Sequence, residues 1–129
     1  QHPLLEKTRE SLMVFCNQRE TQKVFFEAGL HQLIIRCGQK TGEVMVIFVV
    51  DNPLNPIALH FVGGALSQLM ALVPEVVSVY QKVIVKGADK KGSTNRNVTY
   101  ELMEGKPYIR EMIYGLYFDI SPGSFFQVN

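Results

Sequence analysis

The stretch Glu43-Val44-Met45-Val46-Ile47-Phe48-Val49-Val50 is apolar at every position after its first glutamate. Successive side chains of a strand point to opposite faces, so a strand that is apolar on both faces is typical of the centre of a sheet. Residues 38–42 precede it as Gly-Gln-Lys-Thr-Gly, a hairpin loop with glycine at both ends. Before that loop, residues 30–37 contain the β-branched run that strands favour. We therefore expect a hairpin in which residues 43–50 form the central strand.

Helices are expected on either side of this hairpin along the chain. Apolar residues recur at helical spacing from residue 3 to about residue 19, with charged residues opposite them, which predicts an amphipathic helix lying on the sheet. Residues 51–56 contain two prolines and should form a loop. A second helix should then begin at about residue 57 or 63 and end before Pro74. Residues 20–29 are compatible with a short edge strand at 24–26 followed by a turn.

The second half of the chain is expected to consist mainly of strands. Residues 76–86 alternate in the manner of a long strand, and residues 97–103, 108–113 and 116–120 are three shorter candidates. Residues 87–96 are glycine-containing, polar and charged, and they should form an exposed loop. Strands at both ends with helices between them indicate an α+β domain that has a mainly antiparallel sheet and about two helices.

Composition limits the class of protein. With 129 residues, 47% of them hydrophobic and 19% charged, the chain fits one globular domain. A net charge of +1 provides no global field for a polyanion, so any contact with nucleic acid must come from a local patch. Cys16 and Cys37 lie far apart without histidines at ligand spacing, which argues against a metal site and for reduced core thiols. The sequence has no signal-peptide pattern or membrane-length apolar run, so we expect a soluble, cytoplasmic protein truncated at the front.

The last ten residues, Ile-Ser-Pro-Gly-Ser-Phe-Phe-Gln-Val-Asn at 120–129, are unusually apolar for a chain end. Two adjacent aromatic rings followed by a carboxamide are typical of a junction, where rings pack or stack and an amide hydrogen-bonds a ligand. Alternatively, Phe125 and Phe126 are ordinary strand aromatics on opposite faces, and Gln127 is a solvated surface amide. From the first interpretation we infer that the sequence ends where a larger protein continues.

Four blocks of sequence occur in an order typical of a known family. They are Leu-Ile-Ile-Arg at 33–36, Thr-Gly-Glu-Val-Met-Val at 41–46, Gly-Leu-Tyr-Phe at 115–118 and the final ten residues. Together they resemble the S-adenosylmethionine-dependent RNA 5-methyluridine methyltransferases, with weaker similarity between residues 51 and 92. The resemblance implies that residues 1–119 are a central RNA-binding or linker region. It also implies that residues 120–129 begin a Rossmann-like methyltransferase domain absent from this sequence.

The resemblance implies an activity for the full-length protein. A methyl group would pass from S-adenosylmethionine to carbon 5 of a uridine in rRNA or tRNA, after a cysteine has added to carbon 6 of the uracil. That cysteine belongs to the domain beyond residue 129, and neither Cys16 nor Cys37 matches it in context. The fragment alone is therefore expected to be inactive, with structured RNA and the absent catalytic domain as its partners.

The resemblance also assigns roles to individual residues. Gln127 matches a glutamine that contacts S-adenosylmethionine, and Phe125 matches an aromatic position that lines the target-base pocket. Arg36 closes the first block and could hold an RNA phosphate, although an arginine at a strand end can equally pair with a carboxylate. Many family members have Arg-His where this chain has His31-Gln32, which removes a permanent cation and argues against an RNA contact there.

Lys90, Lys91 and Arg96 form the densest basic cluster in the sequence. They can be a solvated loop or a contact for the phosphate backbone of RNA. Two rival interpretations remain for the whole chain. One is a noncatalytic RNA-binding or scaffold module of α+β fold, and the other is a fragment of a small-molecule methyltransferase, which would have no affinity for RNA.

Overall fold

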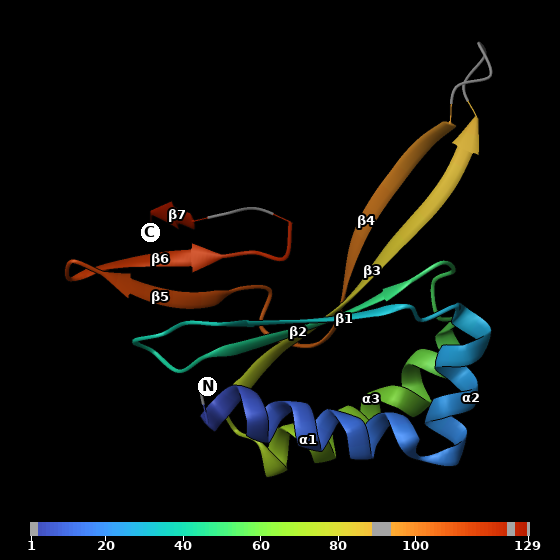
Figure 1. Cartoon of the computed structure of the whole chain (residues 1–129), viewed down its shortest axis with the longest axis horizontal. Coiled ribbons are helices and arrows are strands. Elements are labelled where there is room, and N and C mark those ends of the chain that lie inside the picture. Colours follow the sequence, from blue (N-terminus) through green and yellow to red (C-terminus); the bar gives the residue numbers. More distant parts are fainter. Residues whose placement is uncertain (1–2, 89–93, 124–125, 129) are drawn as a thin grey trace.

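A computed structural model describes residues 3–88, 94–123 and 126–128, and at 86–88, 94–96 and 126–128 it describes the backbone. The helices and strands are labelled in Figure 1. Their bounds are α1 (Pro3–Asn17), α2 (Arg19–Ala28), β1 (Gln32–Cys37), β2 (Val44–Val50), α3 (Pro56–Leu72), β3 (Val76–Ala88), β4 (Thr94–Gly105), β5 (Ile109–Ile113), β6 (Leu116–Ile120) and β7 (Phe126–Val128).

The strands form two sheets. The larger sheet has the order β1-β2-β3-β4, and the smaller has the order β5-β6-β7. Every pairing described is antiparallel except that of β2 with β3, which are parallel and are connected through α3. A parallel pair needs such a crossover because a tight turn can join only antiparallel neighbours. The prediction of an α+β domain with mainly antiparallel strands is confirmed.

Strand β2 is the centre of the molecule, with both of its faces covered. All of its residues are buried. Val44, Val46, Phe48 and Val50 belong to the core that includes the helices, whereas Met45, Ile47 and Val49 cluster with Ile109 of β5 on the other face. In Figure 1 the helices cover one side of the larger sheet, and β5–β7 lie on the opposite side. The prediction of a central strand from its unbroken apolar sequence is therefore confirmed.

The helical layer differs from the prediction in one element. Residues 24–26 lie in helix α2 and not in an edge strand, so the described chain has three helices where the sequence suggested about two. Thr21, Phe25 and Ala28 are its buried residues, at the three-to-four spacing of a helical face. The Phe25 ring stacks on Phe48 of β2 at 4.6 Å between centroids. Tertiary packing thus decides a segment that local preference left open.

The end of α2 and the long β3–β4 hairpin complete the larger half of the molecule. Gly29 has φ 76, a left-handed conformation that ends α2 at little cost because glycine has no Cβ. The hairpin of β3 and β4 projects away from the rest of the molecule (Figure 1). Of the loop that we expected at residues 87–96, residues 87–88 belong to β3 and residues 94–96 belong to β4. The hairpin is therefore longer than the sequence indicated.

Candidate functional site

The predicted site residues are described to different extents. Phe125, Lys90 and Lys91 lie outside the described residues. Gln127 lies in β7 opposite Asp119 of β6, and Arg96 lies in β4, each known from its backbone. The roles expected for these residues remain predictions.

Arg36 is the predicted site residue whose side chain the structure describes. It lies on β1, and its Nη2 atom donates to the carbonyl oxygen of Pro122 at 3.5 Å, a long hydrogen bond. Its Nε atom is buried and has no hydrogen-bond partner among the described residues. No ion pair described for this chain joins Arg36 to a carboxylate, so the carboxylate alternative gains no support. The guanidinium thus lies beside Pro122, which is within the last of the four sequence blocks.

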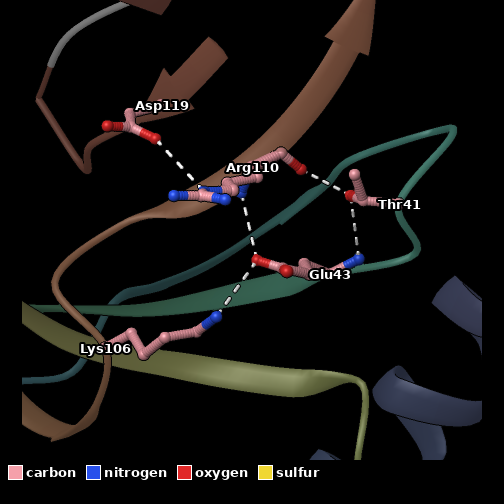
Figure 2. Close-up of polar contacts among 5 residues, drawn as sticks. All are labelled: Thr41, Glu43, Lys106, Arg110 and Asp119. Carbon is pink, nitrogen blue, oxygen red and sulfur yellow. Dashed lines mark hydrogen bonds and ion pairs between the residues drawn. The ribbon is translucent and has the colours of Figure 1, made fainter. Parts of the chain in front are cut away.

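The smaller sheet is attached to the larger one through the β1–β2 loop (Figure 2). The Thr41 hydroxyl donates to the carbonyl oxygen of Arg110, the second residue of β5. Oε1 of Glu43 accepts from the backbone N–H of Arg110 at 3.1 Å and lies 3.7 Å from Nζ of Lys106. Thr41 Oγ1 also accepts from the Glu43 N–H at 3.3 Å. Both main-chain groups of Arg110 are therefore bound by side chains of this loop.

Glu111 contacts the same loop, but here the side chain comes from β5 and the backbone groups come from the loop. Its buried carboxylate accepts from the backbone N–H groups of Gln39 and Lys40, the second at 3.0 Å, and from that of Met112 at 2.9 Å. Burial by itself raises the pKa of Glu111, but the hydrogen bonds from the N–H groups of Lys40, Met112 and Gln39 and the charge of Lys40 outweigh it. The net result is a lowered pKa, so Glu111 is ionised at neutral pH.

Close approach of the two sheets requires a glycine at the start of the loop. A Cβ atom at Gly38 would lie 2.5 Å from the carbonyl oxygen of Arg110, closer than real Cβ atoms approach. Further along, the Tyr80 hydroxyl donates to the carbonyl oxygen of Pro107 at 2.7 Å. Ile109 and Ile120 pack on the face of β2 that is turned away from the helices. Polar and apolar contacts together fix where β5 and β6 lie.

On the smaller sheet itself, Arg110 is surrounded by partners. Its Nε atom lies 3.8 Å from Oδ1 of Asp119, the residue opposite it on β6. Its guanidinium carbon lies 5.7 Å from the centre of the Tyr117 ring, within the range of a cation–π contact. Asp119 in turn lies opposite Gln127 in the β6–β7 register. A chain of paired residues therefore runs from the β1–β2 loop to the strand that carries Gln127.

Sequence reasoning did not identify Thr41, Glu43 and Glu111 as positioned side chains. Thr41 and Glu43 were in a recognised block, but no chemistry was attached to them. The position of Glu111 could have been recognised from the sequence. It is two residues from Ile109 and two from Ile113, so it shares the buried face of their strand. A carboxylate at such a position needs hydrogen-bond donors. Its donors come from a loop about 70 residues earlier, which no local pattern indicates.

The cysteines have the properties expected of core thiols. Burial raises the pKa of Cys16 to about 11, and burial together with the charge of Glu111 raises the pKa of Cys37. Both are free and half-buried. A thiol with a raised pKa is a poor nucleophile at neutral pH because the thiolate is the reactive form. Neither cysteine is therefore suited to attack a uracil.

A metal-binding cluster and a membrane-spanning helix are both absent from the described residues. No group of three or more His, Cys, Asp or Glu side chains there could hold a metal ion. None of the helices in the described ranges is long and apolar enough to span a membrane.

Comparisons with known proteins identify the family. No family model matches the chain. An uncharacterized RNA methyltransferase of Enterococcus faecalis is 37% identical over 97 residues, which are 75% of this chain and 20% of that protein. One from Listeria innocua is 31% identical over 100 residues, covering 78% of this chain and 20% of the relative. The chain belongs to the RNA methyltransferase family. The resemblance inferred from the four blocks is confirmed.

Other RNA methyltransferases match nearly the whole chain. One from Thermosynechococcus vestitus is 27% identical over 128 residues, which are 99% of this chain and 26% of that protein. In the crystal structure of Pyrococcus abyssi tRNA (uracil-54, C5)-methyltransferase with S-adenosyl-L-homocysteine, the matching region has a TM-score of 0.55 and 25% identity. It covers 95% of this chain and 27% of that one. The chain thus spans only 20% to 26% of the length of these curated relatives.

Proposed function

We propose that this chain is the central part of an S-adenosylmethionine-dependent enzyme that methylates carbon 5 of a uridine in rRNA or tRNA. The observation that carries the proposal is the similarity to the Pyrococcus abyssi tRNA (uracil-54, C5)-methyltransferase over 95% of this chain. S-adenosyl-L-homocysteine, present in that structure, is what remains of S-adenosylmethionine after methyl transfer. The same methyl donor is therefore proposed for the full-length protein that contains this chain.

The residues near the end of the chain are proposed to bind a polar ligand. Gln127 lies on β7, an edge strand of the smaller sheet. Nη2 of Arg36 donates to the carbonyl oxygen of Pro122 before β7, and its buried Nε has no hydrogen-bond partner among the described residues. The carboxamide of Gln127 would donate to and accept from S-adenosylmethionine, which when bound supplies an electrophilic methyl group. Phe125 would stack on the extruded uracil. The nucleophilic cysteine is proposed to lie outside this chain, and the chain alone is proposed to be inactive.

The methyltransferase domain is proposed to begin at about residue 120. Residue 120 ends β6, and Ile120 lies opposite Phe126 of β7. The proposed boundary therefore lies within a sheet and not in a linker, which would join the central region and the catalytic domain rigidly. A cytoplasmic location is proposed because the substrates are tRNA or ribosomal RNA.

The proposed activity is tested by methyl transfer with the full-length protein. RNA from a strain that lacks the parent gene is incubated with the protein and labelled S-adenosylmethionine, and the nucleosides are identified by mass spectrometry. We expect label in 5-methyluridine. In a separate calorimetric titration, Gln127→Ala should bind S-adenosylmethionine more weakly than the parent protein. RNA binding without methylation would support the noncatalytic module, and no affinity for RNA would support a small-molecule enzyme.

The proposed RNA contact is tested separately. Replacing Lys90, Lys91 and Arg96 with alanine should lower RNA affinity and flatten its dependence on salt, because fewer counterions are released. The matched control removes three cations from the helical layer: Arg9, Arg19 and Lys23. Equal salt slopes for the parent protein and the first variant would mean that these three cations are solvated and do not contact RNA.

A further inference from the structure

The segment Thr41-Gly42-Glu43 belongs to the sequence block at residues 41–46, and the proposed function assigns it no chemical role. Its polar contacts reach β5, which lies 67 to 69 residues later in the sequence. In addition, the carboxylate of Glu111 on β5 accepts hydrogen bonds from the backbone N–H groups of Gln39 and Lys40 in the loop. We call Thr41, Glu43 and Glu111 the sheet latch, because they join the β1–β2 loop to the smaller sheet. Figure 2 shows the contacts of Thr41 and Glu43.

The hydrogen bonds of the sheet latch restrict the orientation of the smaller sheet. The latch binds main-chain groups, so it fixes the backbone of Arg110 and of the loop and not merely the ends of flexible side chains. Hydrogen bonds to an ionised carboxylate are stronger and shorter than neutral ones. The absence of a Cβ at Gly38 lets the loop approach the Arg110 carbonyl oxygen closely. A small displacement of the smaller sheet would therefore break several of these bonds together.

The sheet latch also lies between the two parts of the proposed site. Arg36 is separated from the β1–β2 loop only by Cys37, so the loop residues of the latch directly follow the strand that carries Arg36. On the other side, β5 pairs with β6 and β6 pairs with β7, where Gln127 lies opposite Asp119. The relative position of Arg36 and Gln127 thus depends on the contact between the loop and β5.

We propose that Thr41, Glu43 and Glu111 are positioning residues of the methyltransferase. They hold the smaller sheet, and with it Gln127, in a fixed place relative to Arg36 and the larger sheet. The inference rests on the proposed function, since Gln127 matters in this way only if it contacts the methyl donor. None of the three residues touches substrate in this scheme; they act through β5, β6 and β7.

The experiment uses the full-length protein and a pair of substitutions at one position. Thr41→Val removes the hydroxyl at nearly constant volume, whereas Thr41→Ser keeps it. We expect Thr41→Val to raise the dissociation constant for S-adenosyl-L-homocysteine by about tenfold and Thr41→Ser to leave it near the parent value. Glu111→Gln should act like Thr41→Val, because an amide N–H₂ would face a backbone N–H.

Matched controls separate positioning from general loss of stability. Thr8 likewise donates its hydroxyl to a backbone carbonyl, that of Leu4 at 2.8 Å, but it is buried and lies in α1. Thr8→Val should lower the melting temperature and leave the dissociation constant unchanged at 25 °C. Amide hydrogen exchange should show faster exchange in β5–β7 of Glu111→Gln and parent-like exchange in β2.

The outcomes distinguish this inference from the proposed function. If the parent protein neither binds the cofactor nor methylates RNA, the proposed function fails and the inference fails with it. If the parent is active and Thr41→Val and Glu111→Gln bind the cofactor as the parent does, the positioning role alone is overturned. A tenfold loss that Thr41→Ser restores and Thr8→Val does not reproduce supports it.

Discussion

The two faces of β2 are covered by layers that are held in different ways. Toward the helices, Phe48 packs with Phe15 and Phe25 in a wide apolar core. Toward β5–β7 the apolar cluster is smaller, and the sheet latch adds directional hydrogen bonds. Apolar packing is not directional, whereas hydrogen bonds are, so the first layer supplies stability and the second fixes an orientation. The layer that carries the proposed site is the one that needs a defined orientation.

The largest expected effect tests the helical face. Phe48→Ala should lower the free energy of unfolding by about 3 to 5 kcal/mol, because it leaves a cavity among stacked rings. Urea denaturation followed by circular dichroism measures the change. Phe26 is 84% exposed, so Phe26→Ala is the control and should change stability by less than about 0.5 kcal/mol. Similar losses for both variants would contradict the assignment of the main core to this face.

A smaller effect is expected on the other face, and it should depend on pH. The pKa of Glu111 is lowered in the folded protein, so its contribution is present above the ordinary carboxyl pKa and is lost as pH falls through the folded value. At neutral pH Glu111→Gln should cost about 1.5 to 3 kcal/mol. Urea titrations at neutral and acid pH should show the parent and the variant converging in acid. A difference that stays constant with pH would exclude a role for the charge.

Two glycines give opposite predictions in the two regions. Gly38→Ala should cost about 1 to 3 kcal/mol, because its Cβ would meet the fixed carbonyl oxygen of Arg110. Gly64 lies in α3 with no neighbouring atom within 4 Å of an added Cβ, so Gly64→Ala should stabilise the protein by up to about 1 kcal/mol. Thermal unfolding of both variants measures these changes. The same sign for both would show that the sheets do not approach as closely as described.

The smallest expected effect concerns the Arg110–Asp119 pair. The two side chains are 45% and 28% exposed and 3.8 Å apart, so solvent screens their attraction. A double-mutant cycle with Arg110→Met and Asp119→Asn should give a coupling energy of about 0 to 1 kcal/mol. A value well above this range would make the pair, and not only the sheet latch, a determinant of the smaller sheet.

Much of the fold could be predicted because the relevant signals are local. The unbroken apolar run of β2, the glycines around the 38–42 loop and the prolines before α3 each act within a few residues. Helix α2 was not predicted, because Phe25 is decided by its contact with Phe48 and not by its neighbours in sequence. The candidate site was predicted only as single residues matched to family blocks. For Phe125, Gln127, Lys90, Lys91 and Arg96 those matches remain predictions.

By itself, the sequence determined the central strand, the α+β class and the family, because periodicity and short motifs are properties of neighbouring residues. Only the tertiary structure decided that Thr41, Glu43 and Glu111 meet across about 70 residues and join two sheets. The physical reason is that a buried carboxylate must find hydrogen-bond donors, and which donors it finds depends on where the folded backbone brings them.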